Sequence, residues 1–122
     1  TGSANLPITA GAFDGSLNGG ADPFVMRLNS GGASLGWSTF LGGALDDRAY
    51  GVAVDSSGNA YVVVETKSAD YPITAAAYDT TSNGSWDVFV TKVTSAGDML
   101  GWSTLVGGGG GEFPGGMSMV VM

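Results

Sequence analysis

The sequence contains no cysteine and no histidine, and charged residues make up only 12% of it. Without cysteine, the chain can form neither a disulfide framework nor a thiolate metal site. The absence of histidine removes the commonest general base, and no Gly-x-Ser-x-Gly nucleophile motif is present. The net charge of -7, with 4 basic against 11 acidic residues, leaves no basic surface for nucleic acid. We therefore expect neither enzyme activity nor a nucleic-acid partner.

The sequence also lacks an apolar run long enough to span a bilayer, so we expect no membrane insertion. It opens on Thr1 without an initiator Met or a signal-like segment, which indicates a processed chain or a piece of a longer one. Glycine, in contrast, is abundant, with 22 residues in a chain that is 43% hydrophobic. This composition is too apolar for disorder and too rich in glycine for a helical bundle. It predicts an all-β fold.

The chain consists of two copies of one unit, displaced by 65 residues without a gap. Leu6–Ala10 falls on Tyr71–Ala75, and Leu35–Thr39 falls on Leu100–Thr104. We name residues 1–65 repeat 1 and residues 66–122 repeat 2, which is truncated and lacks its last strand. A unit of this length cannot bury its apolar faces alone, so function has to be sought in an assembly of units.

Four short runs in repeat 1 have the composition of strands. Phe24–Leu28 and Leu35–Leu41 flank a turn-rich tetrad, and Tyr50–Val54 and Ala60–Val64 flank a second turn that contains Asp and Gly. The loop at residues 67–86 should lie on the surface with little regular structure. Four strands per repeat, joined as an antiparallel meander, are typical of a β-propeller blade. The predicted fold is therefore about two 65-residue propeller-like repeats, incomplete at both ends.

Three segments of repeat 1 resemble a known family. Trp37–Gly43, Asp46–Arg48 and Tyr50–Val62 together are similar to the SBBP-type β-propeller repeat of bacterial and archaeal surface proteins, and the part from Val54 to Val62 also resembles NHL-type propeller blades. The resemblance implies blade architecture and an extracellular or cell-surface location. It implies no catalytic residues.

The same resemblance implies an order of strands within a blade. Tyr50–Asp55 would be the innermost strand and Ala60–Glu65 the second, with Phe24–Leu28 as the third and Leu35–Leu41 as the outermost. The chain would then begin in the middle of a blade and end on an inner strand without its hairpin partner. Because soluble proteins normally avoid an unpaired strand edge, we expect a neighbouring copy to cover it. The expected interface residues are Gly115, Met117, Met119, Val120, Val121 and Met122.

Repeat 2 departs from the motif where Gly111–Gly115 replaces Asp46–Tyr50. This change is explained either by a capping or interface role of a terminal repeat or by drift in a surface loop. Asp46 and Asp47 could in principle act with Asp55 as the paired carboxylates of a hydrolase. Repeat 2 keeps none of the three as Asp, which supports the expectation of a protein without enzyme activity.

A spacing of oxygen-bearing side chains before an Asn-Gly pair occurs in both repeats and resembles the start of a calcium loop. The candidate ligands are Asp14, Ser16, Asn18 and Asp22 in repeat 1, and Asp79, Thr81, Asn83 and Asp87 in repeat 2. No bidentate Glu closes either loop, and the alternative interpretation is an Asn-Gly turn held by Asx hydrogen bonds. Calcium is the cation that this spacing would select. Asn83-Gly84-Ser85 is also a glycosylation sequon by pattern.

The three tryptophans are candidate platforms for stacking on a sugar ring. Trp37 and Trp102 share their strand faces with apolar residues, so we expect both to be buried between blades. Trp86 differs, because it stands in a polar loop where repeat 1 has Ala21, and it is the better candidate for contact with a ligand.

These observations favour a non-enzymatic extracellular structural protein whose incomplete blades are completed by copies of itself in a ring, tube or filament. One alternative is a carbohydrate-binding propeller lectin. Another is an ordered fragment of a longer surface propeller protein.

Overall fold

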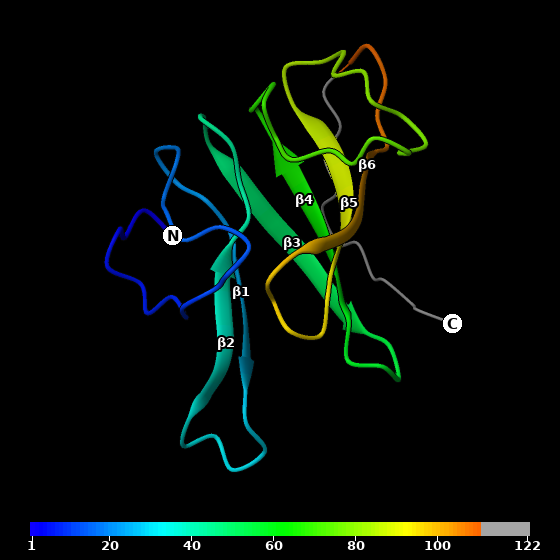
Figure 1. Cartoon of the computed structure of the whole chain (residues 1–122). Helices are drawn as coiled ribbons and strands as arrows, with labels where there is room; N and C mark the ends of the chain where they lie inside the picture. Colours follow the sequence, from blue (N-terminus) through cyan, green and yellow to red (C-terminus); the bar gives the residue numbers. More distant parts are fainter. Residues whose placement is uncertain (111–122) are drawn as a thin grey trace.

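The computed structural model describes residues 1–110, which form strands and loops without any helix (Figure 1). It contains two antiparallel sheets, one of two strands and one of four. The strands are β1 (Phe24–Leu28), β2 (Leu35–Phe40), β3 (Asp47–Val54), β4 (Ala60–Thr66), β5 (Asp87–Val93) and β6 (Leu100–Leu105). The predicted all-β class and the four predicted strands are confirmed, with some strand ends displaced by a few residues. Residues 1–110 contain no helix long and apolar enough to cross a membrane.

The four-stranded sheet is built from both repeats. Its strand order is β3-β4-β5-β6, so repeat 1 supplies the first two strands and repeat 2 supplies the last two. Near the middle of the strands, Gly51 on β3 pairs with Val63 on β4, and Val63 pairs in turn with Val90 on β5. This is the meander expected for one propeller blade, in the expected order of strands. The hairpin of β1 and β2 is the repeat counterpart of β5 and β6, and it therefore corresponds to the outer half of the preceding blade.

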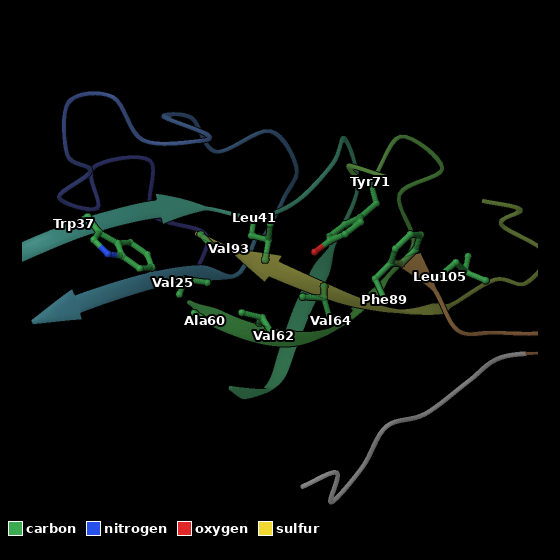
Figure 2. Packing of buried hydrophobic residues seen from close by; sticks show 10 residues of the cluster. All are labelled: Val25, Trp37, Leu41, Ala60, Val62, Val64, Tyr71, Phe89, Val93 and Leu105. Carbon is green, nitrogen blue, oxygen red and sulfur yellow. The ribbon is translucent and has the colours of Figure 1, made fainter. Parts of the chain in front are cut away.

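The core lies between the hairpin and one face of the four-stranded sheet (Figure 2). Alternate residues of β4, Val62 and Val64, point towards the hairpin, as the two-residue period of a strand requires. Leu41 and Trp37 reach this layer from the hairpin side, and Phe89 reaches it from β5. The two sheets are thus held together by a continuous apolar layer, which is the kind of contact made between adjacent propeller blades.

The loops that precede the two hairpins repeat the same hydrogen bonds. The Thr9 hydroxyl donates to the carbonyl of Ser38 on β2, and the Thr74 hydroxyl donates to the carbonyl of Ser103 on β6, both at 3.2 Å. Further along, the N–H of Asp14 donates to a threonine hydroxyl of β2, as the equivalent aspartate of repeat 2 does on β6. The loop at residues 67–86 therefore has no strand, as expected, yet it is pinned along the outer edge of its blade. This arrangement covers the outer strand edges.

Candidate functional site

An apolar groove runs between β1 and β3. It consists of two hollows of 340 and 430 Å³ whose linings share Val25, Met26 and Val52. We name it the β1–β3 groove, and its remaining lining residues are Phe24, Arg27, Leu28, Trp37, Ala49, Tyr50, Gly51, Val54, Gly58, Ala60 and Val62. Within the described part of the chain, β1 pairs only with β2, so the edge of β1 that faces this groove has no strand partner.

The apolar side chains of the groove follow from strand alternation. On β3, Val52 and Val54 point to the face that packs against the hairpin, but they lie beyond the reach of the hairpin and remain 61% and 63% exposed. On β1, Val25 faces the core and is buried, whereas Met26, the next residue along the strand, lies on the opposite face of the hairpin and is exposed. An apolar groove beside an open strand edge is typical of a protein–protein contact site.

Trp37 shows how one blade contacts the next. Its indole N–H donates to the carbonyl of Ser95 at 2.9 Å, in the turn between β5 and β6. The same turn contains Gly97, which has a φ of 71° and whose Cα faces the indole so closely that an added Cβ would meet the ring. Trp37 is 7% exposed, which agrees with its expected burial between blades.

The expectation for Trp102 was wrong, because this side chain is 38% exposed. Trp102 occupies on β6 the position that Trp37 occupies on β2, but the described residues place no further blade against it. Its ring instead contacts Tyr61 edge-on, at 5.8 Å between centroids. The repeat pattern identified the right kind of position, but burial there depends on a neighbour.

A pair of buried carboxylates, Asp22 and Asp47, lies where the hairpin meets the four-stranded sheet. Both carboxylates lie beside Gly42. Oδ1 of Asp22 and Oδ2 of Asp47 are each 2.9 Å from the position that a Cβ on Gly42 would occupy. One oxygen of each is satisfied: Asp22 Oδ2 accepts the N–H of Asn18, and Asp47 Oδ2 accepts the N–H of Gly43. The other oxygen, Oδ1, is buried in both residues and has no hydrogen-bond partner within the described region.

Burial raises the pKa of Asp47, and the neighbouring charge of Asp22 raises it further, although hydrogen bonds from Gly43, Thr66 and Ser68 act in the opposite direction. Sequence reasoning assigned Asp47 to a possible group with Asp46 and Asp55, but the structure does not assemble that group. Asp55 follows the opposite end of β3, where its pKa is lowered to about 2, chiefly by a hydrogen bond from the Asn59 side chain. The pairing of Asp22 with Asp47 had no sequence signal beyond the acidic character of both.

The predicted calcium ligands of repeat 1 are engaged in hydrogen bonds with one another. Asp14 accepts the N–H of Ser16 at 2.9 Å and the side-chain N–H of Asn18 at 2.6 Å, whereas Asp22 points into the buried pair. These bonds form an Asx turn and use the oxygens of Asp14 that a cation would need. Among residues 1–110, no cluster of three or more acidic side chains suited to a metal is found.

The candidate ligands of repeat 2 follow the same pattern. Asp79 accepts the N–H of Thr81 at 2.9 Å, and Asp87 accepts the hydroxyl of Ser82 at 2.5 Å. Oδ1 of Asp87 is buried without a partner in the described region, as it is in its counterpart Asp22. Asn83 is exposed, which leaves the sequon accessible. The calcium and glycosylation assignments remain predictions.

Trp86 is half-buried at the start of β5, and two cations lie against its ring. The guanidinium carbon of Arg48 lies 4.8 Å and Nζ of Lys67 lies 4.3 Å from the ring centroid. These distances are those of cation–π contacts. The ring is thus engaged within the chain.

The expected interface residues Gly115, Met117, Met119, Val120, Val121 and Met122 lie outside the described residues. Their contacts with a neighbour stay a prediction.

Comparison with known proteins agrees with the blade architecture. Residues 36–72, which run from β2 through β3 and β4 into the following loop, match the family model described as SBBP, beta-propeller repeat. No curated protein matches the chain. The match covers the segments that carried the resemblance in the sequence, and the antiparallel sheets are consistent with propeller blades. Residues 36–72 therefore carry an SBBP beta-propeller repeat, within an all-β structure whose antiparallel sheets are consistent with propeller-like blades and, over residues 1–110, are not closed into a ring.

Proposed function

We propose that this chain is a non-enzymatic structural module of the cell exterior that assembles with further copies of itself. The observation that carries the proposal is the open edge of β1 beside the apolar β1–β3 groove. The exterior location follows from the SBBP resemblance, and the absence of enzyme activity follows from the lack of a nucleophile–base motif in the sequence.

Blade completion by a second copy explains both features of the groove. A strand added to β1 would satisfy the unpaired backbone groups of that edge, which is the mode of recognition called β-augmentation. Its side chains would cover Val52 and Val54, which the hairpin leaves exposed to solvent. In the four-stranded sheet, β5, the repeat counterpart of β1, pairs with β4, so the strand that β1 lacks is a counterpart of β4. Gly115–Met122 aligns with Tyr50–Ser57, which includes most of β3, and so has the sequence of the strand that would stand beside the missing one.

Carbohydrate binding has weaker support as an alternative. Of the three indoles, Trp37 is buried and Trp86 is engaged by two cations, so only Trp102 offers an open aromatic face. Beside Trp102 lie Tyr61, edge-on to the ring, and Lys92, its cross-strand partner, which is a smaller set of polar groups than a ligand site usually converges on its ligand.

Light scattering coupled to size-exclusion chromatography tests the proposal. The mass measured for the wild-type protein should exceed the monomer mass of 12.2 kDa and should increase with protein concentration. Val52→Lys places a charge in the groove at a position that is 61% exposed, so it should favour the monomer without unfolding it. Leu45→Lys, at a position that is 53% exposed and outside the groove, is the matched control and should assemble as the wild type does. A wild-type chain that stays monomeric at its highest soluble concentration would refute the proposal.

A further inference from the structure

We propose that Trp102 of one copy docks on the β1–β2 turn of the next copy, at Ser30 and Gly32, and so fixes a head-to-tail register. The inference rests on the proposed self-assembly and specifies the second contact surface. It is carried by a contact inside the chain, that of Trp37 with the β5–β6 turn. The repeat counterparts of both sides of this contact, Trp102 and the β1–β2 turn, lie on the surface.

The internal contact is that of Trp37 with the β5–β6 turn. The indole donates to the carbonyl of Ser95 and lies so close to Gly97 that a Cβ added there would clash with the ring. Glycine is required at that position for two reasons, since its φ is positive and the indole leaves no room for a side chain. The turn is therefore shaped to receive an indole.

The β1–β2 turn has the same chemistry. Ser30 and Gly32 stand 65 residues before Ser95 and Gly97, and the φ of Gly32 is 67°, close to the 71° of Gly97. Among residues 1–110, and apart from Gly32 and its two chain neighbours, no atom lies within 4 Å of a Cβ built on Gly32. The turn thus keeps the shape of an indole acceptor, and none of the described residues occupies the position of the indole.

The indole that matches this turn is Trp102. It stands 65 residues after Trp37 and is paired across strands with Lys92 as Trp37 is paired with Arg27. It is 38% exposed against 7% for Trp37. Trp102 is therefore the exposed counterpart of the indole that makes the internal contact.

The surroundings of both halves are exposed in the same way. Val106 is the repeat counterpart of the fully buried Leu41, yet it is 50% exposed. On the hairpin, Phe24 is the counterpart of the buried Phe89 and is exposed. Each end of the molecule hence presents one half of the apolar interface that joins its own two sheets.

The two halves belong to different surfaces, so the contact is heterologous rather than two-fold symmetric. Repetition of one such contact gives a closed ring or an open helical filament. The partner is therefore a second copy of this chain, which contributes Trp102 to the contact.

Two variants test the contact from opposite sides. Trp102→Ala removes the indole, and Gly32→Asn adds a side chain that would occupy the position of the ring. Asn tolerates a positive φ and has open space at position 32, so this variant should fold normally. Gly11→Asn is the matched control, since Gly11 also has a positive φ, at 78°, and nothing within 4 Å.

Each variant alone should weaken self-association at least about tenfold in sedimentation velocity, as expected for a tryptophan at the centre of an interface. An equimolar mixture of Trp102→Ala and Gly32→Asn should form a one-to-one dimer, because each partner retains the half that the other has lost. Gly11→Asn should associate as the wild type does. Far-UV circular dichroism verifies that the variants are folded.

The outcomes separate the two proposals. A wild-type chain that does not associate overturns the self-assembly on which the inference rests. A wild-type chain that associates while Trp102→Ala and Gly32→Asn associate equally well overturns the Trp102 contact alone and leaves blade completion at β1 standing. Loss of association in both variants without rescue in the mixture overturns the head-to-tail register.

Discussion

Replacing Trp37 by alanine should lower the free energy of unfolding by about 3–5 kcal/mol, the range for a large-to-small change in a core. The side chain is 7% exposed and lies between the two sheets, so its removal leaves a cavity that neither sheet can close alone. The carbonyl of Ser95 also loses its indole donor, a hydrogen bond worth about 0.5–1.5 kcal/mol. Because Gly97 contributes no side chain of its own, it cannot refill the space.

Trp102→Ala provides the comparison at the equivalent position. One face of this ring is open to solvent, so its loss creates no enclosed cavity and should cost about 1–2 kcal/mol in the dilute monomer. Urea unfolding followed by circular dichroism, at a protein concentration that excludes association, measures both changes. Equal costs for the two variants, or a cost below about 1 kcal/mol for Trp37→Ala, would contradict the inference that Trp37 joins the blades.

Three further predictions concern the carboxylate pair and the loops. The raised pKa of Asp47 means that the folded state holds its proton more tightly than the unfolded state, so the contribution of Asp47 to stability should be fully present below the ordinary value of 3.8 and be lost as pH rises through the raised pKa; Asp55, with its lowered pKa, acts in the opposite direction, so the contribution of Asp47 is measured as the difference between wild type and Asp47→Asn in urea titrations at several pH values. Gly42→Ala should destabilise by about 1–3 kcal/mol, because its methyl group would lie 2.7 Å from Cγ of Asp22, whereas Gly109→Ala, with open space around it, should leave the thermal unfolding midpoint unchanged. Excess chelator should leave the melting temperature unchanged if the Asp14 loop is held by its own Asx bonds, and a clear decrease would instead support a calcium site.

The strands and their order in the blade were predictable from the sequence because two independent signals agree. The repeat located equivalent residues, and alternation of apolar residues in runs such as Ala60–Val64 indicated strands. Only the ends differ: β3 begins at Asp47 rather than at Tyr50, and β4 extends to Thr66. Four of the added residues are polar and pair with each other across the two strands, Asp47 with Thr66 and Arg48 with Glu65, which composition alone does not reveal.

The candidate site was less predictable, because burial and pairing depend on what packs where. Trp37 and Trp102 have the same local sequence, yet within residues 1–110 a blade packs against Trp37 and none packs against Trp102. Asp22 was placed in a calcium-like spacing, but its side chain turns inward to meet Asp47 from a different part of the chain. Local spacing describes a loop, whereas these contacts are set by the packing of one sheet on another.

The sequence repeat and the four-stranded sheet are out of phase, since β3 and β4 belong to one repeat and β5 and β6 to the next. A gene duplication of the 65-residue unit therefore adds no independent blade but interlocks each new copy with the one before it. Cleavage at the boundary between the repeats would divide the sheet between its second and third strands. Unfolding should consequently couple neighbouring repeats strongly, with a cooperative unit larger than a single repeat. Because each sheet takes strands from two successive repeats, a chain of such repeats can lengthen by duplication. Each added repeat is then held to the one before it by backbone hydrogen bonds.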